Sequence, residues 1–236
     1  GQLGIGETTN NIAKKSYIMA PAQVKRGESD VKGSAKILVS SSRGNDPYYW
    51  RLLINNTNTP GYSLILTVNN AEKEKIYGLG SNTYGQLGRD ASILSSTAAP
   101  ILTLDVKAAD NIITDRTSTV GGDEVETVTT TTGSLANERV VQLEGGAGHV
   151  MLRTIQTDMS YGNDTADLTQ GWRSRPDIDL VYVMGRGSEG QMGDLIRQNA
   201  SKPVRVVKGE FARHEGTYTY LTGVYEIGTG YFHNVT

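Results

Sequence analysis

GYSLILTVNNAEKEKIYGLGSNTYGQLG, at residues 61–88, decides the fold of this chain because its parts recur elsewhere. Its closing GQLG (85–88) also stands at 1–4 and returns as GQMG at 190–193. The preceding segments IYGLGSNTYGQLG and VYVMGRGSEGQMG align without a gap, and each copy of the motif is followed by a proline and a β-prone run. Such spacing indicates a chain built from a duplicated structural unit.

Composition indicates an all-β fold of short strands joined by turns. The 236 residues include 28 glycines and many Thr, Ser and Asn residues, and they lack sustained helical periodicity. Runs rich in β-branched and aromatic residues, bounded by Gly, Asn, Asp or Pro, mark the candidate strands. These are residues 35–41, 49–55, 62–68, 101–106, 125–132, 139–144, 149–155, 180–185, 204–209 and 218–227. The segment 190–200 is expected to be an irregular loop.

The repeated phrase resembles the RCC1-like repeats, named for the regulator of chromosome condensation, which form the blades of a β-propeller. Residues 61–88 follow the family phrase almost throughout, while 145–155 and 181–193 supply the two parts of a second repeat. GTYTYLTGVYEIGTG (216–230) is read as a third, contracted version. The resemblance covers about half of the chain and implies an RCC1-like propeller with long loop insertions, either partial or completed by another chain.

The motif residues are expected to be structural, since glycine admits the positive φ and close backbone approach that a tight bend between blades requires. Gln86 and Gln191 are expected to cap backbone groups inside the bend. Leu3, Leu87 and Met192 are expected to fill the gap between blades. The full structural set is Gly1, Gln2, Leu3, Gly4, Gly80, Gly85, Gln86, Leu87, Gly88, Gly185, Gly190, Gln191, Met192 and Gly193.

The chain is interpreted as one domain, 1–236, whose unequal repeat spacing places insertions at about 26–57, 107–138 and 156–179. A closed propeller usually has 4–8 blades, and three repeats are clear here. The chain starts on the second half of a repeat and stops after a first half. Three alternatives stay open: a ring closed within the chain, a segment of a longer propeller, or a ring assembled from copies.

Charge and composition exclude several classes of function. A net charge of -2 and a pI near 6.0 argue against nucleic acid as a partner, since that affinity rests largely on Lys and Arg. The absence of cysteine removes disulfides, thiolate nucleophiles and Cys-ligated zinc. No apolar run approaches the length of a membrane-spanning helix, so we expect no membrane insertion.

The search for chemistry predicts a protein that is not an enzyme and has no catalytic residue, metal site or cofactor. His149, His214 and His233 lack any metal-ligand spacing, and His149 is interpreted as a half-buried strand residue. No nucleophile elbow, zinc-binding pair or phosphate-binding loop is present. The acidic residues of the third insertion match no calcium loop and are interpreted as a solvated loop; they are Asp158, Asp164, Asp167, Asp177 and Asp179.

Candidate binding residues are the aromatic and basic side chains of the insertions: Tyr48, Tyr49, Trp50, Trp172 and Arg173. The first hypothesis is a non-enzymatic attachment or assembly module that binds other protein subunits in a homo- or hetero-oligomer. Its expected place is a virion, as a bacteriophage tail or capsid-associated protein, or a cell surface. The alternative is a propeller that binds a host glycan or receptor through these aromatics. A GTPase-regulating module, by analogy with the family's founding member, and a hydrolase using the Asp-rich insertion are weaker hypotheses.

Overall fold

The computed structural model describes residues 34–41, 61–68, 75–91, 96–120, 126–156, 179–208 and 220–236. Every regular element in these segments is a β-strand, which confirms the all-β prediction. The strands are β1 (Ser34–Ser41), β2 (Tyr62–Val68), β3 (Lys75–Ser81), β4 (Ser96–Asp105), β5 (Ile112–Val120), β6 (Glu126–Gly133), β7 (Glu138–Gly145), β8 (His149–Gln156), β9 (Asp179–Gly185), β10 (Ala200–Arg205), β11 (Gly228–Thr229) and β12 (Asn234–Val235). Within the described segments, no helix is long and apolar enough to cross a bilayer.

Strands β1 to β4 form an antiparallel sheet in chain order, which we call unit 1. β2 and β3 pair from Tyr62 opposite Gly80 to Thr67 opposite Lys75. β3 was not among the expected strands, because its sequence KIYGLGS carries two glycines, a residue type depleted in strands. Its last six residues are nevertheless buried, so packing outweighs the weak local preference.

Strands β7 to β10 are consecutive antiparallel neighbours in a second sheet, and we call them unit 2. His149 at the start of β8 pairs with Gly185 at the end of β9, as Tyr62 pairs with Gly80 in unit 1. All seven residues of β9 are buried, which suits a strand covered on both faces. The sequence repeat is therefore also a repeat of strand order and register.

The last strands of the two units, β4 and β10, begin earlier than the sequence suggested. The sequence predicts Pro100 and Pro203 just ahead of these strands, whereas both prolines lie within them. Proline has no N–H for the ladder and is tolerated in a sheet at edges and bulges. β4 is an edge strand, and the pairing of β10 with β9 shifts register between Ala200 and Val204.

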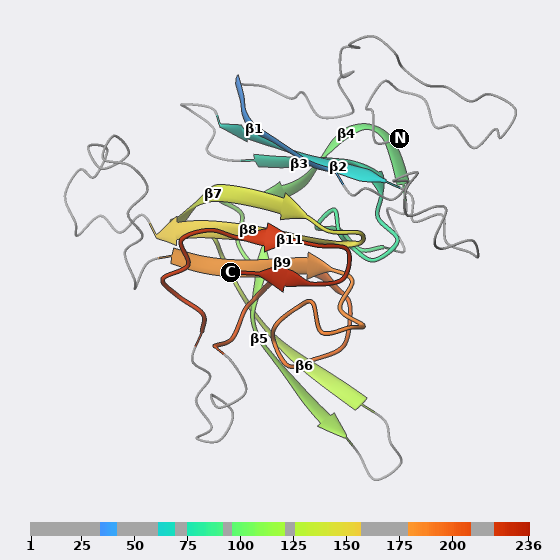
Figure 1. The fold of residues 1–236 in the computed structure, drawn as a ribbon, viewed down its shortest axis with the longest axis vertical. Helices are drawn as coiled ribbons and strands as arrows, with labels where there is room; N and C mark the ends of the chain where they lie inside the picture. Colours follow the sequence, from blue (N-terminus) through green and yellow to red (C-terminus); the bar gives the residue numbers. More distant parts are fainter. Residues whose placement is uncertain are drawn as a thin grey trace, which may run out of the picture.

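The β5–β6 hairpin lies inside the segment 107–138 and extends the unit 2 sheet. β5 joins the edge of β10 by a parallel pairing of Ile113 with Val204, and β6 is the outermost strand. Figure 1 shows the hairpin projecting away from the stacked sheets. Its exposed threonines on β6, which suit a ribbon surrounded by solvent, are Thr127, Thr129, Thr130, Thr131 and Thr132.

Residues 220–236, which we call unit 3, end in the short hairpin β11–β12. The part of the expected strand 218–227 that is described forms only two isolated bridges, at Tyr220 and Thr222, and Gly223 interrupts it with a φ of 73°. The likeness of VYEIGTG at 224–230 to VYVMGRG at 181–187 predicts that Gly228 corresponds to Gly185. Gly228 does not share the positive φ of Gly185, and the hairpin instead matches the junction of β7 and β8.

Two apolar clusters hold the three units together. In Figure 1, β2 and β3 of unit 1 lie above β8 and β9 of unit 2. The first joins β2, β3 and β4 of unit 1 to one face of unit 2 and includes Leu64, Leu87, Leu152 and Tyr182. The second joins the other face of unit 2 to unit 3; its members are Ile113, Met151, Val181, Val183, Met192, Ala200, Val204, Val206, Val224 and Ile227. Unit 2 is thus packed on both faces, and burial of apolar surface holds the three units in series.

Candidate functional site

The loops after β3 and β9 share their backbone conformation. Three glycines in each have positive φ: Gly80, Gly85 and Gly88 in unit 1, and Gly185, Gly190 and Gly193 in unit 2. A Cβ atom at Gly80 would overlap the carbonyl oxygen of Gly61, and one at Gly185 would overlap that of Gly148. Gly80 and Gly185 therefore require glycine for two reasons: the positive φ and the lack of room for a Cβ atom.

The glutamines of the two loops form the same internal hydrogen bond. Gln86 Oε1 accepts from the Tyr84 backbone N–H at 2.9 Å, and Gln191 Oε1 accepts from the Glu189 N–H at 3.0 Å. Leu87 and Met192, which follow them, are wholly buried in the first and second apolar clusters. Each loop is thus held closed by its glutamine and anchored to the interior by the next residue.

A buried hydroxyl fastens unit 1 to unit 2. Tyr62, at the start of β2, is fully buried, and its hydroxyl donates to His149 O at 2.6 Å and to Gly146 O at 3.0 Å. These two carbonyls belong to one turn, closed by a bond from Gly146 N to His149 O at 2.8 Å. The first residue of β2 therefore holds the turn that leads into β8.

The corresponding residue of unit 2 fastens it to unit 3. His149 is fully buried rather than half-buried, and its Nε2 lies 2.8 Å from Asn234 Oδ1. The Asn234 amide nitrogen donates to Gln191 O at 2.7 Å, so its oxygen faces the imidazole and Nε2–H is the donor. Asn234 directly follows a turn that is closed by a bond from Gly230 N to His233 O at 2.8 Å. Equivalent residues of units 1 and 2 therefore both bond to the next unit, Tyr62 to backbone carbonyls of a turn and His149 to the side chain just after one.

Burial lowers the pKa of the His149 imidazole, and the positive charges of the nearby His233 and Arg186 act in the same direction. Hydrogen bonds to Asn234 and to the His233 backbone oppose this shift without reversing it. The buried Nδ1 has no hydrogen-bond partner among the described residues. Charging the ring would place a proton on that atom without an acceptor, which explains why the neutral form is favoured.

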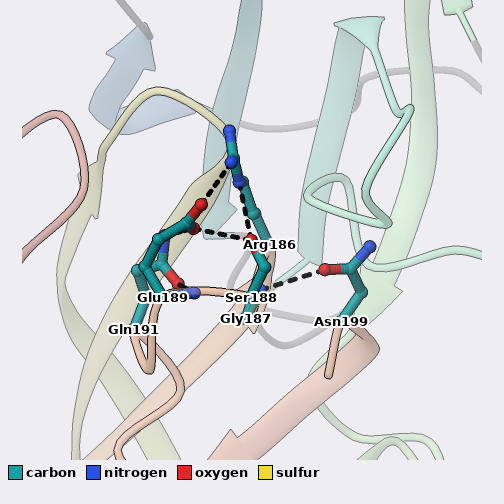
Figure 2. A network of polar contacts seen from close by, with 6 residues as sticks. All are labelled: Arg186, Gly187, Ser188, Glu189, Gln191 and Asn199. Atoms are coloured by element: carbon teal, nitrogen blue, oxygen red, sulfur yellow. Dashed lines mark hydrogen bonds and ion pairs between the residues drawn. The ribbon is translucent and has the colours of Figure 1, made fainter. Parts of the chain in front are cut away.

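All three units meet at Arg186. Its guanidinium lies 5.3 Å from the centroid of the Tyr84 ring of unit 1 and 4.8 Å from that of Phe232 of unit 3. Figure 2 shows the guanidinium directed at Glu189 and Ser188 of its own loop. We call Tyr84, Arg186, Glu189 and Phe232 the seam cluster. It is partly exposed, and Phe232 is 42% exposed.

The seam cluster carries a charged, hydrogen-bonded carboxylate. Burial alone would raise the pKa of Glu189, but hydrogen bonds from Ser188, Gln191 and Arg186, together with the guanidinium charge, hold the pKa below its ordinary value. Figure 2 also shows Gly187 N–H donating to Asn199 Oδ1, at 3.0 Å, which ties the loop to the residues before β10. Aromatic rings, a guanidinium and a carboxylate at a surface suit recognition of another molecule by stacking and charge.

A second polar group lies inside the protein. Glu138 accepts hydrogen bonds from the Thr154 and Tyr182 hydroxyls, and burial raises the pKa of its carboxyl. Lys107 donates to the Glu138 backbone oxygen at 3.0 Å. Within the described segments, no group of three or more His, Asp or Glu side chains is placed to hold a metal ion. Glu138 of β7 therefore ties this strand to β8 and β9 inside unit 2.

The aromatic and basic binding candidates lie outside the described residues: Tyr48, Tyr49, Trp50, Trp172 and Arg173. The same holds for Gly1, Gln2, Leu3 and Gly4, for His214 and for four of the five aspartates of the third insertion. The fifth, Asp179, starts β9 and pairs with Arg153 at 3.4 Å. The binding predictions for the insertion aromatics thus stay predictions.

Sequence reasoning missed the residues that join the units, namely Tyr62, Arg186, Phe232 and Asn234. A signal for part of this set was present. Valine, an aliphatic residue, glycine and histidine follow one another at intervals of three at 140, 143, 146 and 149, and again at 224, 227, 230 and 233. This second spacing aligns unit 3 correctly, whereas the shorter VYxxG match does not.

No family model matches the sequence, and no curated protein matches it. Among solved structures, the chain is similar to human WBSCR16, with 14% identity and a TM-score of 0.25. That match covers 72% of this chain and 41% of the other, so the chain spans less than half the length of that protein.

Proposed function

We propose that this chain is a non-enzymatic module of RCC1-like propeller type that mediates protein–protein assembly. The observation that carries the proposal is an inter-unit contact at the same strand position twice in series, from Tyr62 to the unit 2 turn and from His149 to Asn234 of unit 3. A scaffold in which each unit contacts its neighbours can present one continuous surface to a partner. The proposed setting is a virion, such as a phage tail or capsid, or a cell surface.

Two features of the described residues support an interaction role. The buried ionisable groups that most resemble catalytic residues are Glu138 and the pair of Arg116 and Asp194. Their described bonds are to other groups of the protein. Arg116 Nε lies 2.6 Å from Asp194 Oδ2, and both side chains are almost wholly buried. The seam cluster, by contrast, is partly exposed, and aromatic rings and a guanidinium from three units meet there.

Cross-linking mass spectrometry on assemblies isolated from the native source through the tagged full chain tests this proposal. We expect defined protein partners whose cross-links map near the seam cluster, and weaker recovery for Phe232→Ser. Thr129→Lys, on the exposed β5–β6 hairpin, is the control and should recover the same partners. A glycan array run in parallel separates the alternative. Glycan binding lost in Trp50→Ala or Trp172→Ala, without protein partners, would contradict the assembly role.

A further inference from the structure

The β5–β6 hairpin leaves the unit 2 sheet after a single strand pairing. Within the described segments, β5 meets β10 where Ile113 pairs with Val204, and β6 pairs with no strand other than β5. The pairing of β5 with β6 continues to Val120 opposite Glu126, in the part of the hairpin that projects from the molecule in Figure 1. A ribbon of two strands is marginally stable in water, and further strands stabilise it. The outer part of this hairpin is therefore a ribbon that gains from another strand.

The outer edge of β6 carries none of the features that usually protect an edge strand. Such strands are commonly guarded by charged side chains, by proline or by bulges. Residues 127–133, with the sequence TVTTTTG, contain neither a charged residue nor a proline. The pairing with β5 is regular from Glu126 to Thr131, and its one shift of register lies between Ile113 and Asp115, at the other end of the hairpin. The backbone N–H and C=O groups on this edge can therefore accept an added strand.

The threonines of β6 make this strand complementary to a copy of itself. Thr127, Thr129 and Thr131 are exposed and lie on one face, because side chains alternate along a strand. In an antiparallel pairing centred on Thr129, each of these three lies opposite a threonine of the second copy, and Val128 lies opposite Thr130. Threonine pairs across strands are favourable, and no like charges oppose each other at residues 127–131. The strand therefore fits its own sequence in this register.

We propose that β6 pairs with β6 of a second copy of this chain, in a two-fold antiparallel contact centred on Thr129. The contact joins the two hairpins into one sheet of four strands and gives each ribbon the neighbour that stabilises it. This inference rests on the proposed assembly function and names one partner for it. A two-fold contact uses the same surface on both copies, so association stops at the dimer and the seam cluster is not part of the contact.

Sedimentation velocity of the full chain over a concentration series tests the proposal. We expect an equilibrium between the 25.5 kDa chain and a species of twice that mass. Thr129→Lys and Thr129→Glu each place two like charges opposite each other at the two-fold axis. Each should weaken association about tenfold or more. An equimolar mixture of the two variants brings opposite charges together at the same place and should restore association.

Thr119→Lys is the matched control. Thr119 is exposed and pairs with Thr127, so the variant adds the same charge to the same hairpin, but on β5, one strand away from the edge. It should associate like the original chain. Hydrogen exchange of the original chain locates the contact, since the amides of β6 should gain protection as the concentration rises.

A chain that stays monomeric at every concentration overturns this inference. Association that both Thr129 variants leave unchanged overturns it as well, and so does a mixture of the two variants that fails to associate. The seam cluster is intact in Thr129→Lys, so partners that cross-link near that cluster should still be recovered with this variant. Loss of the β6 contact is thereby distinguished from failure of the assembly function.

Discussion

At the scale of single residues, Gly185 and Gly190 have the same class of backbone conformation but different surroundings. Their φ values are 102° and 88°. A Cβ atom at Gly185 would overlap Gly148 O and lie 2.9 Å from His149 Cα, whereas none of the atoms described lies within 4 Å of one at Gly190. Substitutions at the two positions therefore separate the free-energy cost of a positive φ from the cost of steric overlap.

Gly190→Ala should lower the free energy of unfolding by about 1–2 kcal/mol, the cost of left-handed backbone for a residue with a side chain. Gly185→Ala should lower it by a further ~1–3 kcal/mol, because a methyl group there displaces the start of β8. Urea denaturation of both variants measures the difference. Equal losses would show that the close approach of β8 to Gly185 is absent in solution.

The buried imidazole of His149 predicts a dependence of stability on pH. Its pKa is lowered from the ordinary 6.5, so between these two values the unfolded chain binds the proton and the folded chain does not. The contribution of the neutral His149 ring to stability is therefore fully present above pH 6.5. It falls as the pH drops from 6.5 toward the lowered pKa, with a slope of up to about 1.4 kcal/mol per pH unit.

Denaturation of the original chain and of His149→Tyr between pH 7 and pH 5 isolates this group. Glu138 contributes with opposite sign: its raised pKa favours the folded state at low pH and that contribution is lost as the pH rises. Because both proteins keep Glu138, the difference between their slopes belongs to His149. The variant should lose less stability on acidification; parallel curves would contradict a neutral, buried His149.

At the scale of elements, the junction between β2 and β8 depends on one hydroxyl. Tyr62→Phe removes the donor from Gly146 O and His149 O and should cost roughly 1–3 kcal/mol, as for a buried unsatisfied group. Tyr220→Phe is the comparison, since its hydroxyl donates to Thr114 O at 2.7 Å in a half-buried position. Thermal or urea unfolding should rank Tyr62→Phe as the more harmful; the reverse order would deny Tyr62 its role between units.

The β5–β6 hairpin is fastened to the unit 2 loop by a buried ion pair. Arg116 bonds to Asp194 and also donates to the carbonyl oxygens of Asn199 and Gln198, at 3.2 and 3.3 Å. Arg116→Leu should destabilise the protein by about 3–5 kcal/mol, because it leaves a buried carboxylate without its partner. Adding Asp194→Asn should recover part of this loss. If the double variant loses as much free energy of unfolding as the two single variants added together, the two groups do not interact.

The local sequence predicted which apolar segments form strands. It did not predict where the strands end or which polar segments pair at the edge of a sheet. The apolar runs of β8 and β9 could be recognised in the sequence, since they reflect burial that each strand experiences directly. β5, with the sequence IITDRTSTV, is polar, because it forms a ribbon with β6 and touches the sheet at one parallel pairing. β5 is held by its pairing with β6 and by the bond of Arg116 to Asp194, and neither leaves an apolar pattern in its own sequence.

At the scale of the whole molecule, the repeat spacing carried more information than any single motif. It predicted which glycines share a conformation, and the six in the two described loops all have positive φ. It did not reveal that Tyr62 and His149 perform one task, because a phenol and an imidazole share no sequence pattern. Their equivalence becomes visible only in the structure, where each bonds to the following unit.

Equivalent residues contact the next unit at both junctions of the chain, and nuclear Overhauser effects between side chains detect these contacts without any substitution. We expect effects from the Tyr62 ring to Gly146, and from the His149 ring to Asn234. Effects within the sheets, between Tyr62 and Gly80 and between His149 and Gly185, are the internal reference. Both inter-unit sets should appear together with the reference. Reference effects without the inter-unit sets would mean that the sheets form but do not stack in series, which would contradict the account.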